Sequence, residues 1–291
     1  MKIALHGNVF NEEVKPYIQE VIDFLQKQNI EIVISIKFSD KYNEAFSQPL
    51  NFEVYRRITP ALKVDYVISL GGDGTLLETV SLVGKAETPI LGINTGRLGF
   101  LATTPRDLIG QSLKDLIDRN FKLDCRTLIK LETDADIFKQ TRFALNEFAI
   151  LKTDSSSMIT VHTYVDGEYL NSYWADGLIV STPTGSTGYS LSCGGPIVLP
   201  HSNNFVLTPV SAHNLNVRPL IVSDQSEISF KIEGRSNKFL ISLDSKSESV
   251  DSEVKLSVRK EDFQAKLITF NHLNYFDTLR QKLNWGLDLR N

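Results

Sequence analysis

The feature that most limits how this chain can fold is the segment 67–77, VISLGGDGTLL, in which an apolar run ends at three glycines in four positions. The apolar run predicts a buried strand, and the residues that follow begin a helical pattern. Glycine loses more backbone freedom on folding than any other residue, so this cluster indicates a sharp bend that closely approaches another group. A strand, a glycine turn and a helix in this order favour anion binding, because main-chain N–H groups and the positive end of the helix dipole face the turn.

The first part of the chain alternates between the patterns of strands and helices. Strands are predicted at 2–5, 31–37, 64–70 and 89–93. Helices are predicted at 12–28, from 76 to 83 and at 108–120, and the polar stretch 39–48 is predicted to be a loop. Strands that alternate with helices predict an α/β fold with a doubly wound, mostly parallel sheet.

The second part of the chain, from about residue 123, consists of short alternating segments rich in β-branched and aromatic residues. Asp166-Gly167 lies between two such segments and predicts a two-residue hairpin. Many short strands indicate stacked antiparallel sheets, and helical spacing returns near the end of the chain. We therefore expect an α/β domain at 1–122, a β-rich domain at 123–270 and a C-terminal helix at 271–291.

Composition excludes several classes of protein. The 291 residues carry a net charge of −4 with a pI of about 5.8, which argues against nucleic acid as a partner. The sequence contains no run of about 18 apolar residues, so no membrane span is predicted. The first residues lack the pattern of a signal peptide. The two cysteines, Cys125 and Cys193, form neither a disulfide framework nor a metal-binding spacing. A cytoplasmic protein without a membrane partner is the expectation.

Asp73 is the charged residue within the glycine turn. The turn matches neither G-x-G-x-x-G nor G-x-x-x-x-G-K-[ST], the two common nucleotide-binding patterns. A carboxylate beside phosphates has a purpose if it binds Mg²⁺ or accepts a proton from an attacking hydroxyl. The alternative is a tight turn in which Asp73 caps the following helix.

A second candidate segment is 176–192, DGLIVSTPTGSTGYSLS, where a strand runs into a turn dense in hydroxyl groups. Hydroxyls of this kind donate and accept hydrogen bonds and suit a sugar, an amide or a diphosphate. The alternative is a Ser/Thr/Gly loop that only joins two strands.

A third candidate is Asn146-Glu147, which interrupts the apolar segment RFALNEFAIL. Buried polar groups cost free energy unless they are paired, so both side chains could point into a site and bind the hydroxyls of a ligand. The alternative is simple strand alternation with Glu147 facing water.

These segments together resemble the NAD kinase family. That family carries GGDGT, a later Asn-Glu pair and a DG…TPTGSTAY-type segment in this order, and LGINTGRLGFL at 91–101 is similar to a further element of it. The resemblance implies transfer of the γ-phosphoryl group of ATP, or of a polyphosphate, to the 2′-hydroxyl of the adenosine ribose of NAD, giving NADP. It also implies Mg²⁺ or another divalent cation, and a last helix that packs back on the first domain.

The resemblance implies roles for single residues, with no metal ligand assigned. Asp73 would be the catalytic residue, and Gly71, Gly72 and Thr75 would bind the phosphates of ATP. NAD would be bound by Gly74, Phe100, Asn146, Glu147, Asp176, Thr184, Thr187, Gly188, Tyr189 and Ser192. Asp176 matches a residue that reaches the ligand of a neighbouring subunit, which implies a homodimer or homotetramer.

The chain departs from the family pattern in two places. Gly188 stands where many relatives have alanine, and SLDSKSE stands where the family often shows S-x-D-G-Q, so that Ser245 and Lys246 are departures. Two other functions stay open: a kinase of a lipid or sphingoid hydroxyl, and a nucleotide sensor without catalytic activity.

Overall fold

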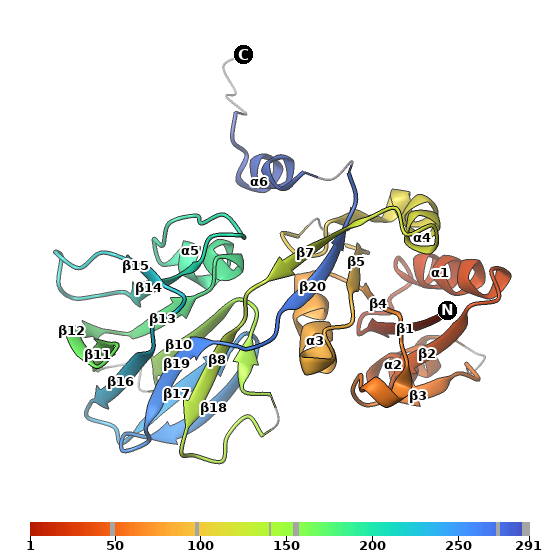
Figure 1. Ribbon diagram of the computed structural model, residues 1–291. Coiled ribbons are helices and arrows are strands. Elements are labelled where there is room, and N and C mark those ends of the chain that lie inside the picture. The colour runs from red at the N-terminus through yellow and green to blue at the C-terminus, as the bar shows by residue number, and fades with distance from the viewer. Residues whose placement is uncertain (47–49, 97–98, 140, 154–156, 272–273, 287–291) are drawn as a thin grey trace. The chain divides into compact units, whose positions relative to one another are not determined.

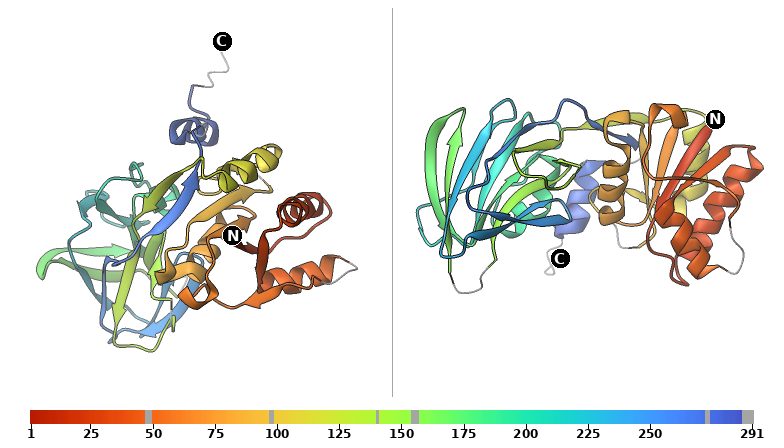
Figure 2. Two further views of the ribbon diagram at one scale, coloured as in Figure 1. Left: turned by 45° about the vertical axis from the view of Figure 1, so that its right-hand side comes forward. Right: turned by 90° about the horizontal axis from the view of Figure 1, so that it is seen from below.

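The computed structural model describes residues 1–46, 50–96, 99–139, 141–153, 157–271 and 274–286. The chain forms two compact units, the first made of 1–125 with 265–291 and the second of 126–264. Figures 1 and 2 show a largely helix-and-sheet first unit and a sheet-rich second unit. Within the described ranges, no helix is both long and apolar enough to cross a bilayer.

The first unit contains an eight-stranded sheet in the order β3-β2-β1-β4-β5-β20-β7, with β6 paired to β5. Its strands are β1 Lys2–Gly7, β2 Glu31–Ser35, β3 Glu53–Tyr55, β4 Tyr66–Leu70, β5 Ile90–Asn94, β6 Thr104–Pro105, β7 Lys122–Arg126 and β20 Ala265–Thr269. The pairs from β3 through β5, and those of β5 with β6 and β20, are parallel. Because β1 lies between β2 and β4, successive strands are added first on one side of β1 and then on the other. Open parallel sheets bind ligands at such a switch point, outside the carboxyl ends of the two strands, which end here at Gly7 and Leu70.

Helices of the first unit connect these strands, and a last helix follows β20. They are α1 Lys15–Lys27, α2 Ile36–Ala45, α3 Asp73–Val83, α4 Ile109–Ile117 and α6 Tyr275–Leu283, with 3₁₀ turns at Pro60–Leu62, Gly84–Ala86 and Arg106–Leu108. Helix α1 buries Ile18, Val21, Ile22 and Leu25 in the core, as its spacing predicts. Helix α6 buries Leu279, and the end of its predicted segment, 287–291, lies outside the described residues.

The predicted loop at 39–48 is wrong over most of its length, since α2 covers Ile36–Ala45 and the predicted strand at 31–37 ends at Ser35. The side chain of Ser35 accepts a hydrogen bond from the N–H of Phe38 and so caps the helix. Phe38 and Tyr42, four residues apart, then turn the same way and are buried. The part of the predicted loop at 47–48 lies outside the described residues.

The second unit consists of two six-stranded sheets, β15-β14-β13-β10-β17-β18 and β12-β11-β16-β19-β8-β9. The first sheet contains β10 Glu147–Lys152, β13 Gly177–Ser181, β14 Asn204–Val210, β15 Leu220–Ser223, β17 Lys238–Leu243 and β18 Lys246–Asp251. The second contains β8 Ile129–Thr133, β9 Phe143–Ala144, β11 Ile159–Val165, β12 Glu168–Ala175, β16 Ile228–Glu233 and β19 Leu256–Lys260. Side chains of both sheets, such as Phe148 and Val161, share one buried cluster, so the sheets are stacked.

The hairpin predicted at Asp166-Gly167 joins β11 to β12. Both residues have positive φ, +53° and +83°, as a type I′ turn requires. The predicted fold class is confirmed: an α/β unit with a mostly parallel sheet, and a unit of stacked antiparallel sheets.

The units divide the chain close to the predicted domain ranges. The predicted boundary between 122 and 123 falls inside β7, and β20 at Ala265–Thr269 joins the first sheet because Leu267 pairs with Ile90. The chain therefore returns to the first unit at residue 265, whereas the predicted β-rich domain extends to 270.

Candidate active site

The glycine turn follows β4 and opens α3 in the first unit. Gly71 has φ of +156°, and any Cβ there would overlap the side chain of Thr75, so only glycine fits. Gly72 is the N-cap residue of α3, and no side chain caps the helix. The turn therefore leaves the first N–H groups of α3 without a side-chain partner, which is the geometry that binds phosphate.

Asp73 does not cap its own helix. Its Oδ1 accepts hydrogen bonds from the N–H groups of Leu101 and Ala102, both at 3.0 Å, and its Oδ2 accepts one from Phe100 at 2.8 Å. The helix-capping alternative for this side chain is therefore wrong. The three bonds hold the carboxylate in one orientation and leave Oδ2 with the greater capacity to accept a further proton donor.

A polar network supports the glycine turn and was missed from the sequence. The hydroxyl of Thr75 donates to Asn8 Oδ1 at 2.9 Å, and Asn8 Nδ2 donates to Glu78 Oε2 at 3.3 Å. Glu78 also meets Lys37 Nζ at 2.8 Å, and the buried His6 ring lies 3.5 Å away. These two neighbours, His6 first, lower the pKa of Glu78 to about 2, so the carboxyl stays ionised. A polar residue directly after the first strand was the only signal for Asn8.

Phe100 lies close to Asp73 through its main chain, as described above, and its ring faces the C-terminal helix. Lys282 Nζ of α6 lies 5.8 Å from the centre of that ring, within the range of a cation–π contact. The first unit thus brings together the turn, Asp73 and Phe100.

In the second unit, Asn146 and Glu147 lie at the start of β10, where the loop after β13 packs on them. The carbonyl of Asn146 accepts the N–H of Thr182 at 2.8 Å, and a Cβ on Gly185 would overlap that same main chain. Glu147 is only 9% exposed, so it does not face water as simple alternation would predict. Asn146 Oδ1 and Glu147 Oε2 are buried, and neither finds a hydrogen-bond partner among the described residues.

The electrostatic setting of Glu147 is unusual for a carboxyl group. Burial first, and then the negative charge of Asp244, raise the pKa of Glu147 to about 8, against the opposing effect of the Tyr189 N–H. Glu147 therefore carries a proton near neutral pH and can donate as well as accept a hydrogen bond.

The hydroxyl-rich segment forms a 3₁₀ turn at Thr184–Thr187 and the short helix α5 at Tyr189–Ser192. Thr184 is buried and accepts a hydrogen bond from Arg126 at 3.1 Å, whereas Thr187 donates to the carbonyl of Thr184. Tyr189 is 39% exposed and Ser192 is exposed, so both can reach a ligand. Gly188 lies beside the polar pair: a Cβ there would be 3.3 Å from Glu147 Oε2.

Asp176 lies just before β13 and forms an ion pair with Lys152, with 2.6 Å between Nζ and Oδ1. The second unit thus gathers Asn146, Glu147, Thr184, Gly188 and Tyr189, all predicted from the sequence. It also places Asp244, which sequence reasoning did not assign, against the polar pair.

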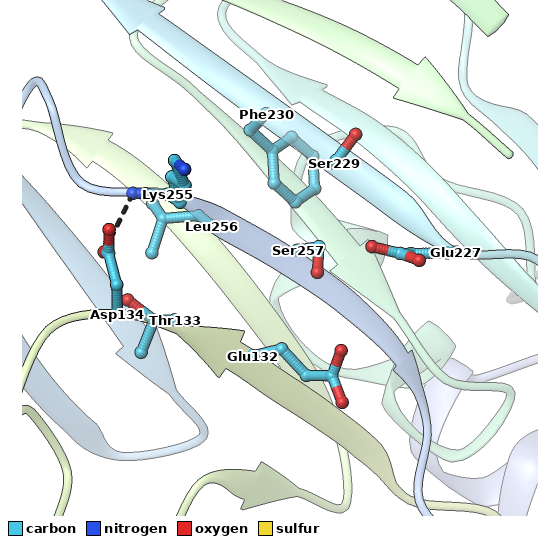
Figure 3. Close-up of a pocket in the computed structure, with 9 residues that line it drawn as sticks. All are labelled: Glu132, Thr133, Asp134, Glu227, Ser229, Phe230, Lys255, Leu256 and Ser257. Carbon is cyan, nitrogen blue, oxygen red and sulfur yellow. Dashed lines mark hydrogen bonds between the residues drawn. The ribbon is translucent and has the colours of Figure 1, made fainter. Parts of the chain in front are cut away.

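A pocket of about 520 Å³ in the second unit lies elsewhere, on strands β8, β16 and β19 (Figure 3). Its lining includes Glu132, Glu227 and Lys255, and the Lys255 N–H donates to Asp134 at 3.1 Å. None of the predicted site residues lines it.

Near the turn, a hard cation would be held only together with a bound ligand. Among the described residues, no three His, Cys, Asp or Glu side chains gather as a metal site. Mg²⁺ is commonly held by one or two carboxylates together with substrate phosphates, and Asp73 beside a phosphate-binding turn fits that arrangement.

An anchored carboxylate in a phosphate-binding turn, and a buried polar pair whose Asn146 Oδ1 and Glu147 Oε2 find no hydrogen-bond partner among the described residues, define a phosphotransferase that acts on a nucleotide. The ATP-NAD kinase N-terminal domain matches residues 3–121, and the ATP-NAD kinase C-terminal domain matches residues 145–270. The chain belongs to the NAD kinase family, and its enzyme class is NAD kinase.

Individual relatives agree with this assignment. The chain is 56% identical to the NAD kinase of Cytophaga hutchinsonii and 44% identical to that of Flavobacterium psychrophilum, in each case over all of both chains. Among solved structures, the NAD kinase of Archaeoglobus fulgidus in complex with ATP is 26% identical, with a TM-score of 0.76 over 98% of this chain and 99% of that one. The yeast NADH kinase complexed with NADH, at 22% identity and a TM-score of 0.88 over 100% and 89% of the two chains, shares the fold. None of these relatives supports a lipid kinase or a sensor.

Proposed function

We propose that this NAD kinase transfers the γ-phosphoryl group of ATP to the 2′-hydroxyl of the adenosine ribose of NAD, with Asp73 as the group that accepts the hydroxyl proton. The observation that carries the proposal is the Asp73 carboxylate, held by three main-chain N–H groups with capacity left on Oδ2. A ribose hydroxyl is a poor nucleophile, and phosphoryl transfer depends mainly on alignment, charge neutralisation and a proton acceptor.

The phosphates of ATP would bind to Gly71, Gly72 and Thr75, at the start of α3, which no side chain caps. A divalent cation such as Mg²⁺, bound through these phosphates, would neutralise the charge that develops on them. Asp73 is the carboxylate within that turn. The hydrogen bonds from Thr75 to Asn8 and from Asn8 to Glu78 hold Thr75 in place.

The adenosine part of NAD would bind to the second unit. Asn146 Oδ1 and Glu147 Oε2 are the buried atoms that a ribose hydroxyl would satisfy, and a nucleotide that left them unpaired would be rejected. Thr184, Thr187, Gly188, Tyr189 and Ser192 would contact the rest of the adenosine, while Gly74 and Phe100 of the first unit would also contact NAD.

Two wider features complete the proposal. Asp176, now paired with Lys152, would bind the nicotinamide amide of a neighbouring subunit's ligand, which makes the enzyme a homodimer or homotetramer. Two free cysteines, both partly buried, suit a cytoplasmic enzyme in a reducing compartment.

The test is the formation of NADP⁺ from NAD⁺, ATP and Mg²⁺, measured with an NADP-specific dehydrogenase. Asp73→Asn should lower kcat by about 10²- to 10⁴-fold and leave NAD⁺ binding largely intact, because general-base catalysis contributes about this much. Asp118→Asn, an exposed carboxylate at the end of α4, is the matched control and should behave as wild type. Turnover of Asp73→Asn near the wild-type rate would show that another group accepts the proton.

The same assay separates the alternatives. Polyphosphate in place of ATP tests the second donor. NAD⁺ binding without turnover for any donor would favour the sensor, and neither binding nor turnover would direct the search to lipid hydroxyls.

A further inference from the structure

Asp244 connects two distant parts of the second unit. It lies in the two-residue turn between β17 and β18 with φ of +52°. Its own N–H donates to the carbonyl of Glu147 at 3.0 Å, so the turn is bound to the start of β10 by its main chain as well as by its side chain.

The carboxylate of Asp244 receives three successive N–H groups. Leu145 donates to Oδ2 at 2.9 Å, and Asn146 and Glu147 donate to Oδ1 at 2.8 Å and 3.2 Å. Hydrogen bonds from successive N–H groups to one carboxylate are strong, because the negative charge of the acceptor strengthens each of them. The main chain between β9 and β10 is therefore oriented by a side chain about 100 residues later in the sequence.

The side chains of Asn146 and Glu147 depend on that main chain. Their Oδ1 and Oε2 atoms are buried without a partner among the described residues, and Gly185 packs directly on the carbonyl of Asn146. A small rotation of this segment would move both polar atoms, and a misplaced hydrogen-bonding group loses its effect over a fraction of an ångström.

We infer that Asp244 is the positioning residue of the acceptor site: its carboxylate holds the main chain of 145–147 so that Asn146 and Glu147 face the ribose of NAD. This inference rests on the proposed function, which places NAD at these two side chains. The carboxylate does not itself need to contact the ligand.

Electrostatics support the same role. The charge of Asp244 is the second cause, after burial, of the raised pKa of Glu147, so Asp244 also helps Glu147 to keep its proton. Burial raises the pKa of Asp244 itself to about 6, while the three N–H groups and then Lys246 act to lower it. Glu147, Lys246 and the nearby Tyr189 are the titratable groups that face this corner.

Lys246 gives a role to one of the departures from the family pattern. It stands where relatives often have glutamine, and its positive charge favours the ionised form of Asp244.

The first test compares NAD⁺ binding by Asp244→Asn and wild type in calorimetric titrations at about pH 7.5, where the Asp244 carboxyl is ionised. An asparagine cannot accept N–H groups with both of its terminal atoms, so we expect the Kd for NAD⁺ to rise at least about tenfold, with the KM for ATP unchanged. Asp224→Asn is the matched control, because Asp224 is a fully buried carboxylate of the same unit that pairs with Lys260 and Gln225. It should lose stability without a comparable change in the Kd for NAD⁺.

The second test is the pH dependence of the Kd for NAD⁺ between about pH 5 and pH 9. If Asp244 had only a structural role, its substitution would not change this pH dependence. In the wild type, protonation of Asp244 should weaken NAD⁺ binding below about pH 6, and Asp244→Asn should abolish this loss of affinity. Lys246→Gln, an exposed substitution that serves if Asp244→Asn does not fold, should move that loss to higher pH at low ionic strength.

Each remaining outcome is decisive. If Asn146→Ala weakens NAD⁺ binding while Asp244→Asn folds and binds NAD⁺ as wild type does, the inference is overturned. The same holds if Asp244→Asn does not fold and Lys246→Gln leaves the pH profile unchanged. If Asn146→Ala has no effect on NAD⁺ binding, the proposed acceptor site is wrong, and the inference fails with it for that separate reason.

Discussion

Gly99 packs so tightly against the carboxyl group of Asp73 that a single Cβ at position 99 would overlap Oδ1. The next three residues are the ones whose N–H groups bind that carboxylate. Gly99 is thus what allows the segment 100–102 to reach the carboxylate of Asp73.

Gly99→Ala should therefore displace Asp73 or the segment that binds it. We expect a loss of activity of at least about 100-fold, comparable to that expected for Asp73→Asn, and a lower stability by about 1–3 kcal/mol from overpacking. Steady-state kinetics and urea denaturation measure the two effects. Gly96→Ala is the control, since nothing lies within 4 Å of a Cβ there, and equal effects of both substitutions would contradict this account.

Two glycines of one loop should respond differently to alanine. A Cβ on Gly185 would overlap the main chain of Asn146, whereas a Cβ on Gly188 would lie 3.2–3.6 Å from its neighbours. Gly185→Ala should cost about 1–3 kcal/mol and strongly weaken NAD⁺ binding, while Gly188→Ala should stay within about 1 kcal/mol of wild type. Thermal denaturation and NAD⁺ titration check this, and a severe effect of Gly188→Ala would show that this chain needs the space beside Glu147.

Glu147 should make the second unit less stable as the pH rises. Its pKa is raised from 4.5 to about 8 in the folded state, so between these values the unfolded chain has lost a proton that the folded chain keeps. Stability should fall across pH 4.5–8 and level off above pH 8. The total change should be on the order of a few kcal/mol.

Glu147→Gln should remove most of this slope, because glutamine does not titrate. In a Trp285→Phe background, Trp174 is the single tryptophan and reports on the second unit in denaturant titrations. If the Glu147→Gln variant kept the same slope as the parent protein, the titration would belong to another group, with Asp244 as the first candidate.

The contribution of Glu78 to stability should change with pH in the opposite direction to that of Glu147. Its pKa is lowered from 4.5 to about 2 in the folded state, so its contribution is present above pH 4.5 and is lost as the pH falls towards 2. Glu78→Gln should cost at most about 3 kcal/mol at neutral pH, and less after solvent screening, and should flatten the acid limb of a circular-dichroism denaturation profile.

Glu12→Gln is the control for Glu78, because Glu12 forms an exposed ion pair with Lys15. Such pairs contribute about 0–1 kcal/mol. A Glu78→Gln protein with the wild-type acid limb and an unchanged KM for ATP would show that the network does not support Thr75.

Local patterns in the sequence were enough to predict the strand, glycine turn and helix around Asp73, the type of fold in each part of the chain and the hairpin at Asp166-Gly167. Such elements depend on periodicity and on residues with positive φ, which are properties of neighbouring residues. The helix Ile36–Ala45 escaped prediction because its mean polarity is high, and its two buried aromatic residues show their role only once they pack on the sheet.

The candidate residues themselves were also readable in the sequence, because glycine and polar residues inside apolar runs are costly without a purpose. Their partners were not. Asp73 is held by residues 27–29 positions away, and the Asn146–Glu147 pair by a carboxylate 97–98 positions away. Spacing along a chain says nothing about which distant main-chain groups meet a side chain, so the hydrogen bonds that orient the site, and the burial that keeps a proton on Glu147, arise only when the sheets have formed.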